Sequence, residues 1–243
     1  MTSDFFSGLK NSVDFIIIRH GQSEGNAAKI LQGRGEYTLS ETGCVQALAR
    51  SQTLKAELAG TAPGRILLFS SPLERARETA RIIAAQIIAE QIIVENVNEL
   101  VFLDDLMEME LGIWSGKNWE QVMNEEPSLW AAFMARSWDA IPGAESSEAL
   151  YDRSLRLWAV LRDAAIESCA EKIIIVTHGG LIQWLLKSTF RSRSWFPLFP
   201  ISNCGQFKLC VQPHPTEKSA YLCWEEINSP LPNQNTQPRG FPS

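Results

Sequence analysis

FIIIRHGQSEGN, residues 15 to 26, is the stretch that says most about the fold. Its three consecutive isoleucines are typical of a short strand buried on both faces, as in a parallel sheet. Arg19 and His20 follow where that strand ends, and glycines come next. In open α/β sheets, ligands bind beyond the carboxyl ends of the strands. The Arg-His pair is therefore a candidate ligand site, and the alternative is a capped strand with a solvated pair.

KIIIVTHGG, residues 172 to 180, repeats this order of a β-branched run, a histidine and glycines. If the two strands are neighbours, His20 and His178 face each other although they are far apart in the sequence. The alternative is two unrelated loop histidines. The third histidine, His214, lies between two prolines in an expected turn and has no such context.

Strands alternating with helices predict an α/β fold: a three-layer sandwich with a mostly parallel central sheet and helices on both faces. We expect loops over 20–40 and 104–118, strands over 65–71, 205–211 and 219–226, and a helix passing into a short strand within 82–95. We expect helices over 41–59, from Pro72 onward with Ser71 as its cap, over 119–137 with a break at Pro127, and over 146–168.

The bulk composition is that of one globular domain over 1–227. The chain has 243 residues, of which 45% are hydrophobic. The tail over 228–243 is rich in Pro, Asn and Gln, and we expect it to be disordered. A net charge of −6 argues against non-specific nucleic-acid or anionic-membrane binding. The oligomeric state is not indicated.

The five cysteines are scattered and odd in number, which indicates neither a disulfide framework nor a zinc site. No apolar stretch has the length of a signal peptide or a membrane span. We therefore expect a cytoplasmic protein that does not bind membranes.

Four blocks in order, RHGQSEGN, SSPLERARETA, LMEMELGIWSG and VTHGG, resemble the histidine phosphatase superfamily, also called the phosphoglycerate mutase-like family. The likeness covers residues 14 to 210. It implies the phosphoglycerate mutase-like fold, with a helical cap inserted around 117–145. The aromatic residues of that cap either line a substrate pocket or form its core, and the second is favoured; they are Trp119, Trp130, Phe133 and Trp138.

The residue types suit phosphoryl transfer from a small phosphate ester. A neutral imidazole attacks phosphorus without adding negative charge, and a guanidinium neutralises phosphoryl oxygens through its planar set of donors. Arg19 and Arg75 are the candidate arginines. Arg77 and Arg81 lie on the same segment as Arg75, and the resemblance selects Arg75.

The resemblance also implies roles for single residues. His20 would be the nucleophile that forms a phosphohistidine. The residues expected to hold the phosphoryl group or substrate are Arg19, Asn26, Gln32, Arg34, Arg75, His178 and Gly179. Gln32 and Arg34 lie in LQGRGEY, where an ordinary polar loop is the alternative. Asn203 and Gly205 match a late segment of some relatives too weakly for assignment.

The leaving oxygen needs a proton, and a carboxyl group is the expected general acid. The pattern L-x-E-x-x-x-G-x-W-x-G selects Glu108, whereas Glu110 is the alternative neighbour. The set His20, Glu108, His178, Arg19 and Arg75 is thus the expected catalytic set. We expect neither a metal nor another cofactor, because the arginines and histidines supply the positive charge.

Cys44 and Arg50 satisfy the C-x₅-R spacing of cysteine-dependent phosphatases. That mechanism needs the intervening residues to loop round phosphate, whereas VQALA favours a helix. We therefore expect Cys44 to be a helix residue.

Hydrolysis, isomerisation and simple binding remain as alternatives. Mutases of the family typically have R-H-G-E-S-x-W-N, whereas Gln22 and Gly25 replace the Glu and Trp here. These departures favour a phosphatase, with a phosphoglycerate mutase as the alternative. A non-catalytic phosphate-binding regulatory protein is the alternative of another class.

Overall fold

The computed structural model describes residues 2–89, 99–194, 200–216 and 218–231. Within these ranges the strands are β1 (Thr2–Ser3), β2 (Val13–Arg19), β3 (Ile66–Ser70), β4 (Leu100–Phe102), β5 (Lys172–Thr177), β6 (Gln206–Pro213) and β7 (Ala220–Ser229). The α-helices are α1 (Glu24–Ala27), α2 (Glu41–Leu58), α3 (Glu74–Ala89), α4 (Trp119–Glu125), α5 (Pro127–Arg136), α6 (Ser147–Ser168) and α7 (Gly179–Thr189). None of the helices described has the length and apolar character needed to cross a membrane.

The described strands form one seven-stranded sheet in the order β1-β7-β6-β2-β5-β3-β4. The neighbours β2, β5, β3 and β4 are parallel to one another, whereas β6, β7 and β1 pair antiparallel. Because β2 and β5 are parallel neighbours, Arg19 pairs with Thr177 at their shared carboxyl edge. The predicted adjacency of the two histidine-bearing strands is therefore confirmed.

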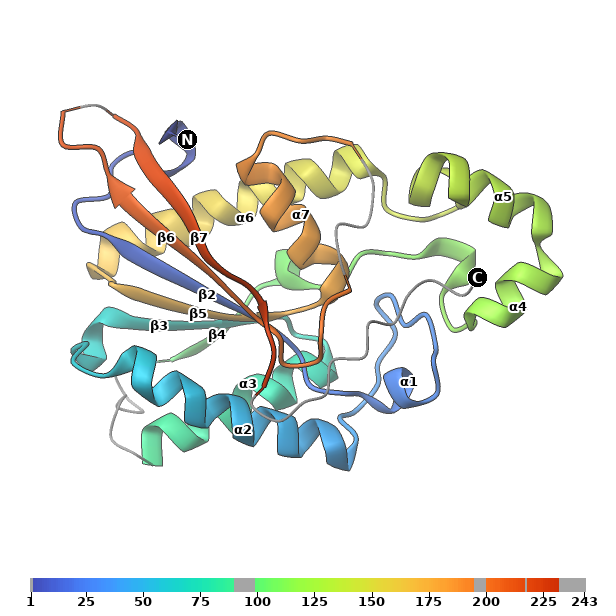
Figure 1. Cartoon of the computed structure of the whole chain (residues 1–243), viewed down its shortest axis with the longest axis horizontal. Coiled ribbons are helices and arrows are strands. Elements are labelled where there is room, and N and C mark those ends of the chain that lie inside the picture. The colour runs from blue at the N-terminus through green and yellow to red at the C-terminus, as the bar shows by residue number, and fades with distance from the viewer. Residues whose placement is uncertain (1, 90–98, 195–199, 217, 232–243) are drawn as a thin grey trace.

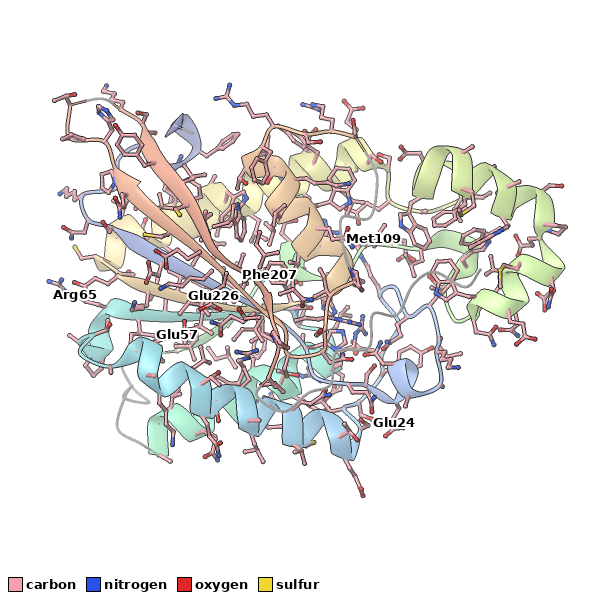
Figure 2. The ribbon with its side chains drawn as sticks, in the orientation of Figure 1. Glu24, Glu57, Arg65, Met109, Phe207 and Glu226 are labelled. Carbon is pink, nitrogen blue, oxygen red and sulfur yellow. The ribbon has the colours of Figure 1, made fainter. Side chains whose placement is uncertain are left out.

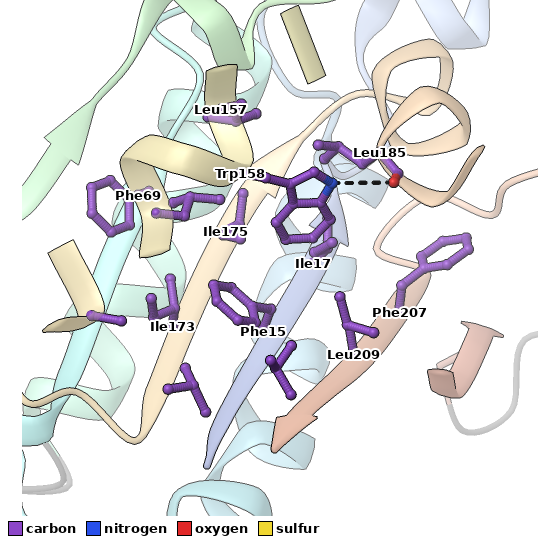
Figure 3. Packing of buried hydrophobic residues seen from close by; sticks show 14 of the residues in the cluster. Phe15, Ile17, Phe69, Leu157, Trp158, Ile173, Ile175, Leu185, Phe207 and Leu209 are labelled. Carbon is purple, nitrogen blue, oxygen red and sulfur yellow. Dashed lines mark hydrogen bonds between the residues drawn. The ribbon is translucent and has the colours of Figure 1, made fainter. Parts of the chain in front are cut away.

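The side chains of β2 alternate between the two faces of the sheet, and apolar residues on both sides are covered by helices. Successive side chains point to opposite faces. Phe15 and Ile17 pack on the side of α6 and α7, where the indole of Trp158 donates a hydrogen bond to the Leu185 carbonyl at 3.3 Å (Figure 3). Phe15, Ile17 and Trp158 are all fully buried.

The other face of β2 carries Ile16 and Ile18, which pack with Leu54 of α2 and Ile83 of α3. Figure 1 shows α2 and α3 on this side of the sheet and α6 and α7 on the other. The three-layer sandwich predicted from the sequence is confirmed, with a sheet whose parallel strands lie together on one side of β6.

Two local predictions were wrong. The expected loop over 20–40 contains α1, because the side chains of Ser23 and Asn26 form a reciprocal capping box. The helix after β3 begins at Glu74 and not at Pro72. The Ser71 hydroxyl accepts a hydrogen bond from the Leu73 N–H at 3.2 Å, which forms a turn before the helix.

The segment from Trp119 to Ala140 forms α4, α5 and a short 3₁₀ helix at one end of the molecule (Figure 1). Its aromatic rings pack on one another and on Trp114, which precedes the segment: the centroid of Phe133 lies 5.2 Å from that of Trp114 and 5.0 Å from that of Trp138. These aromatic residues form the core of the helical segment.

The carboxyl-terminal boundary differs from the expected one. The strand β7 continues through Asn228 to Ser229, and Leu231 is buried against Ala47. The rest of the expected tail, and 90–95 of the expected helix-to-strand segment, lie outside the described residues.

Candidate active site

His20 and His178 lie directly after β2 and β5, and their rings are 5.1 Å apart between centroids. The two residues are 2% and 0% exposed, so both imidazoles are held in surroundings of low dielectric. The backbone N–H of His20 donates to the Thr177 carbonyl at 2.9 Å, which extends the pairing of the strands up to the site.

The anchoring of His20 determines which of its nitrogens is free. Nδ1 lies 2.7 Å from the Gly21 carbonyl oxygen, which only accepts hydrogen bonds, so Nδ1 carries the proton of the neutral ring. Burial, with the positive charges of Arg19 and Arg75, holds the pKa of His20 well below its usual value. The ring is therefore neutral, and Nε2 keeps its lone pair.

His178 is also kept neutral. Burial is the main cause of its lowered pKa, and the positive charges of Arg75 and Arg19 lower it further. Its Nε2 lies 2.8 Å from the Ser71 hydroxyl oxygen. Its Nδ1 is buried and has no hydrogen-bond partner within the ranges that the structure describes.

Arg75 lies in the first turn of α3 and is 1% exposed. Its two terminal nitrogens donate to the carbonyls of Gly35 at 2.8 Å and Gly33 at 2.7 Å. Burial lowers the pKa of its guanidinium to about 10, so it remains charged at neutral pH. Its Nε is buried without a partner among the described residues, and the charge of the guanidinium acts on both histidines.

Arg19, at the end of β2, donates to the carbonyl of Ile201, and its backbone N–H donates to the Gly205 carbonyl at 3.1 Å. Gly179, the first residue of α7, lies against this side chain: a Cβ built at Gly179 would be 3.5 Å from Arg19 Nε. The backbone of Gly179 therefore lies beside the arginine, with room for ordinary van der Waals contact.

Asn203 is a site neighbour that could not be assigned from the sequence. Its amide Nδ2 donates to the His20 carbonyl at 3.2 Å and to Asn26 Oδ1 at 3.1 Å. Asn26, in α1, is thus tied to the residue that carries the candidate nucleophile. The signal in the sequence was only a polar residue near a glycine before β6.

Gln32 is buried, and its Oε1 accepts from the Ser23 hydroxyl at 2.8 Å. Gly25 makes this placement possible, because a Cβ at Gly25 would lie 2.6 Å from Gln32 Cδ. The absence of a side chain at Gly25 is therefore required by the position of Gln32.

Glu108 lies against the start of α7. Its carboxylate accepts from the backbone N–H groups of Gly180 and Leu181, each at 3.2 Å. A Cβ at Gly180 would lie 2.5 Å from Glu108 Oε1 and 2.7 Å from Sδ of Met109, which is labelled beside α7 in Figure 2. Glycine at 180 is what allows the carboxylate to approach the helix.

Arg34 does not contact the histidines in this structure. Its Nε donates to the Glu108 carbonyl at 3.2 Å, and its Nη2 forms an ion pair with Glu145 at 3.2 Å. Glu145 also receives two hydrogen bonds from Arg153, each at 2.8 Å. The side chain of Arg34 thus contacts the backbone of the segment that bears the candidate acid, Glu108.

Arg153 was missed by the sequence analysis, because a single arginine on a helix gives no sign of a partner in a distant loop. It is 3% exposed. Besides Glu145, it donates to the carbonyls of Met107 at 2.6 Å and Asp105 at 3.0 Å. The carbonyls of Met107 and Glu108 are therefore both held by arginines that share Glu145.

Cys44 and Arg50 do not form a phosphate loop. Both lie in α2, as expected. Arg50 is buried and donates to the carbonyls of Cys204 at 2.9 Å and Ser229 at 2.7 Å. Since the Cys204 N–H donates to the carbonyls of Arg19 and His20, Arg50 supports the segment behind the candidate nucleophile.

Comparison with known proteins finds relatives of this chain by sequence and by structure. The chain is 33% identical over 172 residues to a metal-independent phosphoserine phosphatase of Arabidopsis thaliana, covering 70% of this chain and 66% of that protein. It is 31% identical to phosphoglycerate mutase-like protein 4 of the same plant, covering 75% of this chain and 74% of that one. A mycobacterial glucosyl-3-phosphoglycerate phosphatase solved with VO3 superimposes with a TM-score of 0.71 at 25% identity, over 90% of this chain and 99% of that one.

The family model described as the histidine phosphatase superfamily (branch 1) matches residues 15–221. This range begins in β2 and reaches β7, and it includes the four candidate site residues Arg19, His20, Arg75 and His178. The sequence blocks, the fold and the adjacency of His20 and His178 therefore have one explanation. The chain belongs to the histidine phosphatase superfamily.

Proposed function

We propose that this protein is a phosphomonoesterase that acts through a phosphohistidine on His20. The observation that carries the proposal is the pair of buried, neutral imidazoles 5.1 Å apart, with the charges of Arg19 and Arg75 acting on both rings. One ring has a free lone pair on Nε2, and the surrounding cations suit a phosphoryl group with its negative charge.

In the first step, the Nε2 lone pair of His20 attacks phosphorus, and the bond from phosphorus to the ester oxygen breaks. The ring of the phosphohistidine carries a positive charge, and its Nδ1–H keeps its hydrogen bond to the Gly21 carbonyl. Glu108, as general acid, gives a proton to the leaving alkoxide, which departs as an alcohol.

In the second step, water attacks the phosphohistidine, and the bond from nitrogen to phosphorus breaks. Glu108 takes a proton from that water, and inorganic phosphate is released. The electron pair returns to Nε2, so His20 is again neutral with its proton on Nδ1. Arg19 and Arg75 provide donors for the oxygens of the phosphoryl group in both steps.

Hydrolysis is favoured over the mutase reaction by Gly25 and Gln32. A tryptophan at 25, as in the mutase pattern, conflicts with Gln32, because even a Cβ there would lie 2.6 Å from it. The relatives named as phosphatases support the same choice, although other relatives are named as mutases or as mutase-like. We therefore place the chain in the phosphatase branch.

The test is a panel of phosphate esters given to the full chain, with release of inorganic phosphate as the measurement. The panel contains O-phosphoserine, glucosyl-3-phosphoglycerate, 3-phosphoglycerate, sugar phosphates, nucleotides and an aryl phosphate. His20→Asn should abolish release, whereas His214→Asn, remote from the site, serves as the matched control. Conversion of 3-phosphoglycerate to 2-phosphoglycerate faster than phosphate release would establish a mutase, and phosphate binding without turnover of any ester would leave a binding protein.

A further inference from the structure

Ser71 is a buried residue between β3 and α3 that touches the second histidine. It is 0% exposed, and its hydroxyl oxygen lies 2.8 Å from His178 Nε2. The same oxygen accepts the Leu73 N–H at 3.2 Å. Ser71 was expected to be a helix cap, and no part of the mechanism above uses it.

The proton of this hydroxyl has one destination. A serine hydroxyl has one donor and two acceptor lone pairs, and a buried donor without an acceptor costs about 1–3 kcal/mol. Leu73 occupies one lone pair of the Ser71 oxygen. Among the described residues, the only acceptor recorded for the hydroxyl proton is His178 Nε2, so the hydroxyl donates to that nitrogen.

A neutral imidazole has one proton, and an Nε2 that accepts leaves that proton on Nδ1. His178 Nδ1 is the nitrogen that is buried and has no partner in the described part of the chain. We propose that Ser71 is a positioning residue that holds His178 in the Nδ1–H form, so that the ring presents a hydrogen-bond donor to an oxygen of the phosphoryl group.

The proposal makes the two histidines complementary. His20 is anchored at Nδ1 by the Gly21 carbonyl and keeps a lone pair on Nε2, whereas His178 is anchored at Nε2 by Ser71 and keeps a proton on Nδ1. Both rings thus have the same tautomer, but one offers a nucleophile and the other a donor. Without Ser71, the His178 proton could move to Nε2, and a lone pair on Nδ1 would face the phosphoryl oxygens.

Nitrogen NMR of ¹⁵N-histidine-labelled protein reads the tautomer directly. The chain has three histidines, so three imidazole patterns are expected, and His178→Gln and His214→Gln assign them. We expect His178 with a protonated Nδ1 and an acceptor Nε2 in the wild type and in Ser71→Thr. In Ser71→Ala, we expect loss of this single form, with proton density on Nε2.

Ser70→Ala is the matched control, because Ser70 is equally buried but its hydroxyl donates to the Ser71 carbonyl at 3.0 Å and does not contact His178. Its His178 pattern should equal that of the wild type. A protonated Nε2 on wild-type His178, or an unchanged His178 pattern in a folded Ser71→Ala variant, would overturn the proposal.

The donor role rests on the proposed function, and its readout is separate. Ser71→Ala should lower kcat by no more than about 10²- to 10³-fold, the usual effect of losing one preorganised donor. Titration with inorganic phosphate should shift the Nδ1 signal of His178 in the wild type and much less in Ser71→Ala; equal shifts would refute the donor role. If no ester is hydrolysed, the proposed function fails while the tautomer is still measured.

Discussion

Replacement of Arg153 by methionine should be among the most destabilising single changes in this protein. Arg153 is 3% exposed and makes four hydrogen bonds: two to Glu145 at 2.8 Å, and one each to the carbonyls of Met107 at 2.6 Å and Asp105 at 3.0 Å. Arg153→Met keeps the length and apolar stem of the side chain. It removes all four of the hydrogen bonds that Arg153 donates to these acceptors.

The expected loss follows from what is left behind. Removing one partner of a buried ion pair costs about 3–5 kcal/mol, because the other charge remains unpaired in low dielectric. Arg34 still contacts Glu145 but is 38% exposed, so it compensates only in part. We therefore expect Arg153→Met to lower the free energy of unfolding by about 3–5 kcal/mol. With an m-value of about 3 kcal/mol/M, the urea midpoint would fall by about 1 M or more.

Arg156→Met is the matched control on the same helix. Arg156 is 61% exposed and pairs with Asp105 at 3.6 Å. Such exposed pairs contribute about 0–1 kcal/mol. Urea unfolding, monitored by circular dichroism, measures the free energy of unfolding of both variants. A difference between them of less than about 1 kcal/mol would show that the buried pair does not stabilise the segment that bears Glu108.

Three further predictions concern the acid and the histidines. Glu108→Gln should lower kcat on an alkyl phosphate by about 10²- to 10⁴-fold, because the leaving alkoxide then receives no proton. The variant should still release a burst of phenolate from an aryl phosphate, whose leaving group needs no proton. Rapid-mixing kinetics with both esters measure the first step, and an equal loss of rate with the two esters would contradict this role of Glu108. Gly180→Ala should reproduce this difference between the esters, because its Cβ would lie 2.5 Å from Glu108 Oε1; unchanged alkyl phosphatase activity would contradict it. Since burial lowers the pKa of His20 and His178 below 6.5, only the unfolded chain takes up these protons as pH falls. The free energy of unfolding should therefore fall as the pH is lowered from about 6.5 to 5, by up to about 1.4 kcal/mol per pH unit for each histidine. Urea unfolding at several pH values measures this, and in a His20→Gln/His178→Gln variant the free energy of unfolding should depend less steeply on pH.

The framework of the site could be predicted because it depends on short-range patterns. Runs of three isoleucines favour strands buried on both faces, and a histidine directly after such a strand lies at the sheet edge. His20 and His178 followed from this rule, and the adjacency of their strands is confirmed. The family blocks added Arg75 and Glu108, whose catalytic roles remain predictions.

The supporting contacts could not be predicted, because they join residues that are distant in sequence. Ser71 followed by proline matches a helix cap, and nothing local indicates that its hydroxyl meets a histidine 107 residues later. Arg153 and Glu145 look like ordinary helix and loop residues until α6 is packed beside the loop after β4. In the sequence, Gly25 is only a departure from the mutase pattern, whereas the structure relates it to the side chain of Gln32.

Trapping of a phosphoenzyme tests the central claim most directly. The full chain is mixed with a ³²P-labelled phosphate ester that it hydrolyses, quenched in denaturant, and digested to locate the label. We expect label on the peptide that contains His20, labile to acid and stable to alkali, present in His214→Asn and absent from His20→Asn. Label that persists in His20→Asn, or that resists acid, would contradict a phosphohistidine on His20.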